Sequence, residues 1–350
     1  MLLLPVLALL LLLCAPNARA AASAGCGRAA PASGDYTWST GGVARRYRLH
    51  VPAAYDASAA RPLVLLFHGW SGDASDFIYP GSAAVQQADK FNYVLAAPVG
   101  LSDVDVKVDA VWQTFNSWSF RGSSNGVGGD GAPSCDPLHT PNYPYNSCTL
   151  SGPMNGCGWT HCMADDVAMT VALVARLAQQ LCLDTANVFA MGSSNGGMFT
   201  WELGQNPASA PLLRAIAPLI GLPIRGFADG KGRAGDLPVL LVTGLRDTTV
   251  PPGLWGKEGW TATPRNSGQV YFYTSATTMV KKWSSDMGCA TSKQPRLMRL
   301  GLPGLVCKTF CAGRSPKVVD CRGARMGHDY NDDVTIPFAF RFFRDHSVTS

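Results

Sequence analysis

The stretch MGSSNGGMF, residues 191–199, decides how the rest of the chain is interpreted. It contains the pattern Gly-x-Ser-x-Gly at residues 192–196, with Ser194 as the central serine. Because this pattern is common by chance in Gly- and Ser-rich chains, its surroundings must carry the argument. An apolar run at 187–191 predicts a strand before it, and 198–203 predicts a helix after it. A sharp strand-to-helix turn would then present the Ser194 hydroxyl at the carboxyl edge of a sheet, and Gly192 and Gly196 would leave room for that turn.

Strands and helices are predicted to alternate on both sides of this turn. Apolar runs at 63–67, 93–97 and 239–243 indicate strands buried on both faces, whereas the alternating pattern at 46–51 indicates a strand near a sheet edge. Helical spacing predicts a helix over 164–181, with acidic residues in its first turn, and the aromatic segment 336–346 predicts another. This alternation is typical of a mostly parallel central sheet with helices on both faces.

A serine hydroxyl needs a neighbouring base, and the chain has six histidines. His328 is the one that lies late in the chain on a predicted strand-to-helix loop. Asp247 follows the predicted strand at 239–243 and is the preferred carboxylate; Asp229 and Asp236 are the rivals. The order Ser194, Asp247, His328 is that of the α/β-hydrolase fold. We therefore predict an α/β-hydrolase whose catalytic residues are these three.

The developing negative charge of an acyl-transfer reaction requires two main-chain N–H donors. Asn195 follows the serine and is expected to supply one of them. Trp70 follows the strand at 63–67 and His68-Gly69, and is expected to supply the other. These two residues are the predicted oxyanion hole.

A cysteine-rich insertion interrupts the alternation at about residues 112–162. It is rich in Gly, Pro, Asn, Trp and Tyr, shows no strand or helix period, and is long enough to suggest a functional loop. Trp112, Trp118 and Trp159, together with Tyr143 and Tyr145, are candidates either for a substrate-binding cleft or for a small core. Cys157, His161 and Cys162, with Cys135 or Cys148, form an alternative zinc site, which we rank below disulfides.

Residues 1–20 read as a signal peptide, with a leucine-rich run and Ala18-Arg19-Ala20 as the cleavage site, although no Lys or Arg precedes the run. The run is shorter than a membrane-spanning helix, so we expect no membrane anchor. Of 11 cysteines, Cys14 leaves with this segment and ten remain, an even number that favours disulfides in an extracellular protein. Their connectivity stays open. Residues 21–350 are expected to form a single catalytic domain.

The charge balance argues against nucleic acid as a partner. Removal of residues 1–20 takes away Arg19, which leaves 28 basic and 24 acidic residues, a net charge of +4, without any basic block. The predicted chemistry needs neither a metal nor a cofactor. The oligomeric state stays open.

The chain resembles the family of secreted feruloyl esterases, acetylxylan esterases and polyhydroxybutyrate depolymerases, known as carbohydrate esterase family one. The resemblance runs from about Tyr47 to His346. The matching motifs are Phe67-His-Gly-Trp70, Asp165-Asp-Val167, Gly192-Ser-Ser-Asn-Gly-Gly-Met198, Gly244-Leu-Arg-Asp247, Trp283 to Cys289 and Met326-Gly-His328. The chain departs from the family where Asp329-Tyr330 follow His328 and in the insertion.

The resemblance implies an extracellular serine esterase. A feruloyl esterase that releases hydroxycinnamic acids from cell-wall xylan is the first expectation, with an ester on plant-type polysaccharide as substrate. A polyhydroxybutyrate depolymerase, acting on polyester, or an acetylxylan esterase is the alternative. An inactive secreted scaffold that only binds polymer is the non-enzymatic alternative, and the presence of all three predicted catalytic residues disfavours it.

Overall fold

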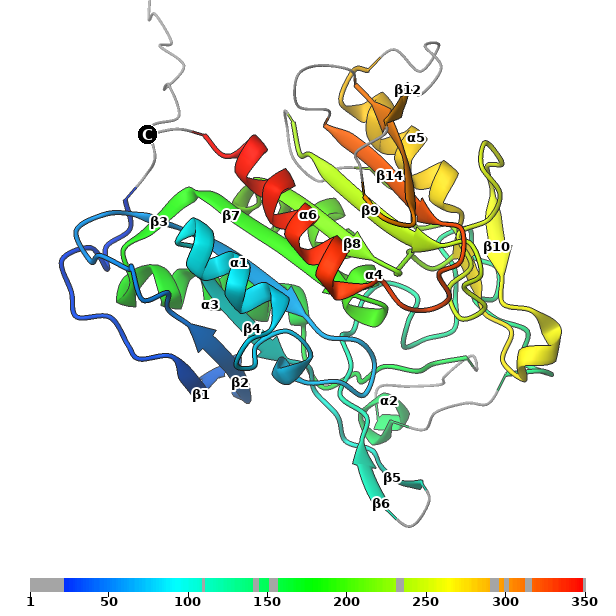
Figure 1. Ribbon diagram of the computed structural model, residues 1–350. Helices are drawn as coiled ribbons and strands as arrows, with labels where there is room; N and C mark the ends of the chain where they lie inside the picture. Colours follow the sequence, from blue (N-terminus) through cyan, green and yellow to red (C-terminus); the bar gives the residue numbers. More distant parts are fainter. Residues whose placement is uncertain are drawn as a thin grey trace, which may run out of the picture.

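The computed structural model describes residues 22–108, 111–140, 145–150, 157–230, 236–289, 296–298, 302–311 and 317–348. A ten-stranded sheet runs through them in the order β1-β2-β4-β3-β7-β8-β9-β14-β13-β12 (Figure 1). Its strands are β1 (Gly34–Thr40), β2 (Val43–His50), β3 (Arg61–Phe67), β4 (Val94–Val99), β7 (Leu183–Ser193), β8 (Ala215–Leu219), β9 (Val239–Gly244), β12 (Arg296–Met298), β13 (Leu305–Phe310) and β14 (Val318–Gly323). The predicted signal peptide, residues 1–20, lies outside the described residues.

The central six strands, from β4 to β14, are parallel, and antiparallel strands flank them on both sides. The helices are α1 (Ala83–Phe91), α2 (Asn146–Leu150), α3 (Asp166–Gln180), α4 (Asn195–Gln205), α5 (Ala276–Asp286) and α6 (Asp332–His346), with single 3₁₀ turns at Ala74–Asp76, Ala210–Leu212 and Arg265–Ser267. This sheet order with crossover helices confirms the predicted α/β-hydrolase fold. No helix in the described part of the chain is long and apolar enough to cross a membrane.

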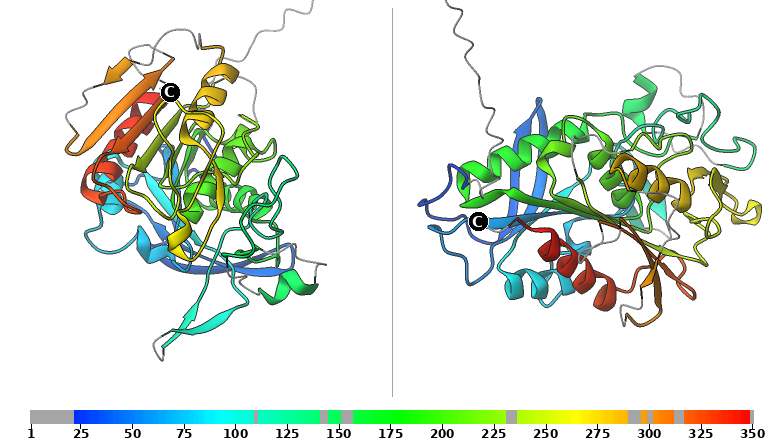
Figure 2. Two further views of the ribbon diagram at one scale, coloured as in Figure 1. Left: turned by 90° about the vertical axis from the view of Figure 1, so that its right-hand side faces the viewer. Right: turned by 90° about the horizontal axis from the view of Figure 1, so that it is seen from above.

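Each face of the sheet has its own hydrophobic core. Successive side chains of a strand point to opposite faces, so Leu63, Leu65 and Phe67 of β3 pack with residues of α3, α4 and α5. Val64 and Leu66 of the same strand pack with α1 and α6 instead. The view from above in Figure 2 shows α3 on one side of the sheet and α1 and α6 on the other. Burial on both faces explains why these central strands are continuous apolar runs.

Strand β4 is longer than the sequence suggested, because Pro98 does not end it. Pro98 pairs with Tyr47 of β2, and the strand continues to Val99. The β3–β4 ladder stops at the pair Leu65–Ala96. A proline has no N–H to donate to a neighbouring strand. Because the pairing with β3 has already ended before Pro98, no donor to β3 is needed at this position.

The insertion at 112–162 has more local structure than its sequence pattern predicted. Its first residues belong to the hairpin of β5 (Asp105–Val108) and β6 (Val111–Thr114), and α2 follows later. In Figure 1 this hairpin projects from the end of the molecule that also carries the small hairpin of β10 (Trp260–Ala262) and β11 (Phe272–Thr274). Main-chain bonds join the insertion to β10–β11, from Phe272 N–H to Ser134 O and from Asp136 N–H to Val270 O, each 2.8 Å.

All ten cysteines outside the predicted signal peptide are paired. The disulfides are Cys26–Cys182, Cys135–Cys157, Cys148–Cys162, Cys289–Cys311 and Cys307–Cys321. Two of them lie within the insertion and use the four cysteines of the zinc alternative. Those thiols are therefore engaged in disulfides, and the described residues contain no cluster of His, Cys, Asp or Glu suited to a metal ion.

A buried ionic cluster ties both ends of the insertion to the sheet. Asp166, at the start of α3, accepts hydrogen bonds from Arg45 of β2 (2.7 Å) and from His161 Nε2 (2.9 Å). It also accepts one from the Ser119 N–H (2.7 Å). The Arg45, His161 and Asp166 side chains are at most 1% exposed, so each depends on its partners for compensation of the lost hydration.

We predict that Asp166→Ala is strongly destabilising, because it leaves the Arg45 charge buried without its carboxylate. The expected loss is about 3–5 kcal/mol in the free energy of unfolding, measured by urea titration. Asp35→Ala is the matched control. It breaks the ion pair with Arg48 at the surface and should change stability by less than about 1 kcal/mol. Equal effects of the two substitutions would contradict this account of the cluster.

Candidate active site

Ser194 lies between the last residue of β7 and the first residue of α4, with φ 52° and ψ −117°. A non-glycine residue in this region of backbone space stores about 1–3 kcal/mol of strain. The Ser194 N–H donates to Leu219 O (2.9 Å), and the Ser194 carbonyl accepts from the Met198 N–H (2.9 Å). These bonds hold the tight strand-to-helix turn that the sequence pattern predicted.

The glycines around Ser194 permit close contact between three segments of backbone. A Cβ at Gly192 would collide with the Gly196 carbonyl, and a Cβ at Gly196 would collide with the Phe67 carbonyl. A Cβ at Gly197 would lie 2.5 Å from Leu219 O. The pattern Gly-x-Ser-x-Gly-Gly is thus a packing requirement at this turn as well as a sequence motif.

The structure brings together the three residues predicted to form a catalytic triad. The His328 Nε2 lies 2.8 Å from Ser194 Oγ, and its Nδ1 lies 2.8 Å from Asp247 Oδ2. The other oxygen of Asp247 accepts from the N–H groups of Thr249 and Val250, both at 2.8 Å. This fixed carboxylate orients the imidazole so that Nδ1 donates to Asp247 and Nε2 accepts the serine proton, which is the arrangement of an activated nucleophile.

The rival carboxylates and histidines have other partners. Asp229 forms an ion pair with Arg121, and Asp236 forms one with Lys317. The remaining histidines bond to Gly69 O, Phe342 O or nearby aspartates: they are His50, His68, His139, His161 and His346.

The loop at residues 68–72, here called the oxyanion loop, lies directly beside Ser194. A Cβ at Gly69 would be 3.6 Å from the Ser194 Cβ. Asn195 is the first residue of α4, and its N–H has no acceptor within its own helix because of that position. Trp70 and Asn195 are therefore placed next to the nucleophile, on two different segments. Their roles as oxyanion donors remain a proposal.

His68 is the first residue of this loop, and its side chain is a buried, neutral imidazole. Its Nε2 accepts from the Gly100 N–H (2.9 Å), so its hydrogen is on Nδ1, which lies 2.6 Å from Gly69 O. Complete burial, which disfavours the charged ring, lowers the pKa of His68 from 6.5 to about 4. No role for His68 was predicted from the sequence, where its position before Gly69 was the only signal of one.

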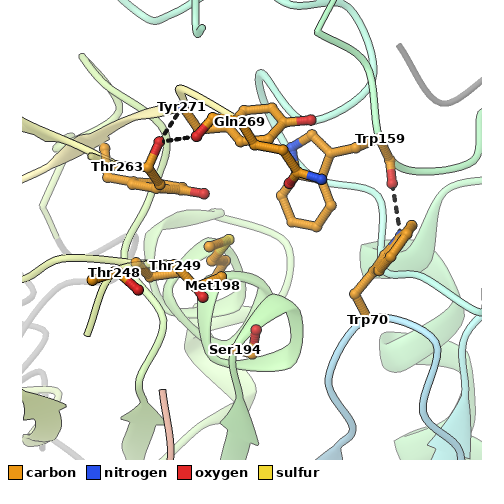
Figure 3. A pocket seen from close by; sticks show the side chains of 11 residues that line it. Trp70, Trp159, Ser194, Met198, Thr248, Thr249, Thr263, Gln269 and Tyr271 are labelled. Carbon is orange, nitrogen blue, oxygen red and sulfur yellow. Dashed lines mark hydrogen bonds between the residues drawn. The ribbon is translucent and has the colours of Figure 1, made fainter. Parts of the chain in front are cut away.

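A cavity of about 330 Å³ opens next to Ser194. Figure 3 shows Ser194 at its floor, Trp159 and Gln269 opposite, Trp70 on one side, and Thr248 and Thr249 on the other. The lining residues are Trp70, Trp159, Ser194, Met198, Thr248, Thr249, Val250, Thr263, Gln269, Tyr271 and Tyr273, none of which is acidic or basic. Burial raises the pKa of the Tyr273 phenol well above its usual value, so this phenol stays protonated.

The three tryptophans suggested for substrate binding have different locations. Trp159 lines the cavity and packs edge-on against Tyr271, with ring centroids 6.1 Å apart. Trp118 does not line it; it is 0% exposed and packs between Phe67 and Phe199, so its assignment to the cleft is wrong. Trp112 is part of β6, and its side chain, like residue Tyr143, lies outside the described residues. Tyr145 is fully buried and accepts from the Trp70 Nε1 (2.9 Å).

Comparison with known proteins gives limited but consistent similarity. No family model matches the chain. It is 31% identical over 94 residues to proteins named "Probable feruloyl esterase C" from Aspergillus flavus and Aspergillus oryzae, a match that covers 27% of this chain. The chain thus matches about a third of the length of these curated relatives (33%). The short match agrees with the esterase resemblance of the motifs.

The solved structures that are similar to this chain are more distant in sequence. Acetyl xylan esterase from Aspergillus awamori is 13% identical, with a TM-score of 0.49 over 87% of this chain and 94% of that one. The S-formylglutathione hydrolase from Agrobacterium tumefaciens is 11% identical, with a TM-score of 0.47 over 89% and 94% of the two chains. The fold assignment rests on the sheet order of the chain itself.

We predict that Ser194 reacts with a fluorophosphonate probe and that the reaction depends on its two partners. His328→Gln removes the base, and Asp247→Asn favours the wrong tautomer, so each should slow labelling by about 10³-fold or more. Mass spectrometry of the labelled peptide identifies the site. Ser193→Ala is the matched control and should label at nearly the wild-type rate. Unchanged labelling of His328→Gln would contradict the triad.

The low pKa of His68 predicts acid sensitivity of the fold. Between pH 6.5 and 4 the unfolded chain binds a proton at position 68 that the folded chain does not bind, so protonation favours unfolding. The stability present above pH 6.5 is lost as the pH falls, by about 2.5 kcal/mol at pH 4.5. The free energy of unfolding, measured by urea titration at pH 7 and at pH 4.5, should fall by this additional amount in the wild type compared with His68→Gln. Equal losses in the two proteins would be evidence against a buried neutral imidazole.

Proposed function

We propose that this protein is a secreted serine carboxylic ester hydrolase that acts through an acyl-enzyme. The observation that carries the proposal is the hydrogen-bonded series Ser194, His328, Asp247 at the carboxyl edge of the sheet. His328 accepts the Ser194 proton as Oγ attacks the ester carbonyl, and the oxyanion accepts hydrogen bonds from the Trp70 and Asn195 N–H groups. His328 then protonates the departing alcohol, and water repeats the sequence to release the acid.

The proposed substrate is a hydroxycinnamoyl ester on plant-type cell-wall polysaccharide such as xylan. The cavity beside Ser194 is uncharged and has aromatic rings on several sides, which suits a planar aromatic acyl group. Trp159 contributes one of these rings, and its Nε1 is buried without a hydrogen-bond partner among the described residues. The similarity to proteins named feruloyl esterase supports the same choice.

Export is part of this proposal. Five disulfides are typical of proteins that fold in an oxidising compartment. A polymeric cell-wall substrate also requires an enzyme outside the cell. We propose that residues 1–20 direct secretion and that residues 21–350 form one catalytic domain, so N-terminal sequencing of the secreted protein should begin at Ala21.

The experiment is a matched hydrolysis assay of the purified protein on methyl ferulate, acetylated xylan and a hydroxybutyrate oligomer. Ser194→Ala is the blank, since it removes the nucleophile and leaves the turn geometry available. We expect ferulate release that falls at least about 10³-fold in Ser194→Ala. Liquid chromatography of the released acid gives the rate.

The other outcomes distinguish the alternatives. Oligomer cleavage without ferulate release would replace the proposal by a polyester depolymerase, and acetate release alone would replace it by an acetylxylan esterase. No Ser194-dependent hydrolysis of any of the three, despite binding to xylan, would favour the inactive scaffold.

A further inference from the structure

Trp118 connects the two segments that carry the proposed oxyanion donors. Its indole Nε1 donates to His68 O at the start of the oxyanion loop (3.0 Å). Its main-chain N–H donates to Asn195 Oδ1 (2.7 Å), and its carbonyl accepts from Asn195 Nδ2 (3.1 Å). One fully buried residue of the insertion therefore holds both the loop and the first residue of α4.

The bonds on the loop side determine how the Trp70 N–H points. The Gly69 carbonyl and the Trp70 N–H belong to one planar peptide group and point in opposite directions. The Gly69 oxygen accepts from His68 Nδ1 (2.6 Å) and from the Gly72 N–H (3.1 Å). Because Trp118 bonds to the His68 carbonyl and its ring packs at a tilt against the His68 ring, with centroids 4.9 Å apart, it restrains the peptide plane that contains the proposed donor.

The same part of the insertion also holds the far end of the oxyanion loop. The Asn116 carbonyl accepts from the Ser71 N–H (2.8 Å), and Asn116 Nδ2 donates to Gly72 O (2.9 Å). Residues 116–118 therefore bond to the loop at both of its ends and to Asn195. One short stretch of chain thus sets the distance between two proposed N–H donors that lie on different segments.

We propose that Trp118 is a positioning residue that sets the geometry of the oxyanion hole from within the insertion. The inference rests on the proposed function, because it concerns how the same site stabilises its transition state. Preorganised donors stabilise the developing charge without reorganisation during the reaction. Loss of the Trp118 bonds should therefore lower kcat while substrate binding, which depends on the cavity, changes little.

The first test replaces Trp118 by β-(3-benzothienyl)alanine, which keeps the bicyclic shape and lacks the N–H donor. We expect kcat on the best ester substrate to fall about 10- to 100-fold, while KM stays within about twofold of the wild-type value. This loss in kcat is smaller than the loss expected when one oxyanion donor is removed. The affinity for a trifluoromethyl ketone inhibitor, which forms an oxyanion on Ser194, should fall in parallel with kcat/KM. Trp118→Phe should repeat the effect, with a small cavity added.

Trp283→Phe is the matched control. Trp283 is also 0% exposed and donates its Nε1 to a carbonyl, Leu237 O at 2.7 Å, but it belongs to α5. Its substitution should leave kcat and inhibitor affinity nearly unchanged in the folded protein. A double-mutant cycle of Trp118→Phe with Asn195→Ala, which keeps the main-chain donor of residue 195, should give a combined loss smaller than the product of the single losses.

The outcomes separate this inference from the proposed function. Wild-type kcat and inhibitor affinity in the benzothienyl variant would overturn the positioning role, while Ser194-dependent esterase activity still stood. An equal loss in Trp283→Phe would also overturn it, because a general packing effect would then explain both. Failure of the wild-type protein to hydrolyse any ester would overturn the proposed function itself.

Discussion

The tight turn at Ser194 is the constraint on which the other features of the site depend. A serine with φ 52° is retained only where its surroundings fix it, and here the fixing contacts come from three parallel strands. The first turn of α4 packs so closely against the ends of β3, β7 and β8 that glycine is required at 192, 196 and 197. The same close approach brings the oxyanion loop after β3 next to the serine. The close packing at these strand ends therefore determines the geometry of the candidate site.

Asp247 and His328, the proposed acid and base, lie on loops that follow strands, whereas Ser194 lies in the tight turn between β7 and α4. Asp247 follows β9 and His328 follows β14, which are neighbouring parallel strands. Their loops are joined by a bond from the Arg246 N–H to Met326 O (2.9 Å), and a Cβ at Gly244 would collide with the Gly327 carbonyl. The two loops therefore hold the acid and the base in register with each other, and the turn after β7 supplies the third member.

The fold and the proximity of Ser194, Asp247 and His328 could be predicted from patterns along the chain. Apolar strands at 63–67 and 239–243 and the glycines around Ser194 each reflect a short-range requirement. The chain order of Ser194, Asp247 and His328 follows from the order of the strands that precede them, β7, β9 and β14. The role of Trp118 could not be predicted, since a tryptophan in an aperiodic segment suits a cleft and a core equally well. The end of β4 was misjudged because the effect of Pro98 depends on where the β3 ladder stops. His68 was overlooked because its role depends on Gly100, which is distant in sequence.

The insertion connects the cavity proposed to hold the acyl group with the proposed oxyanion hole. Trp118 contacts the oxyanion loop and Asn195, and Trp159 lines the cavity. The main-chain N–H of Trp159 donates to Ser123 O (2.9 Å). Ser123 Oγ in turn donates to the carbonyl of Phe120 (2.7 Å), which lies two residues after Trp118 in the chain. Two disulfides link parts of this segment to each other, and the Asp166 cluster holds it against the sheet. Substitutions near Trp159 that alter the proposed acyl-binding cavity should therefore also affect the segment that contacts the proposed oxyanion donors.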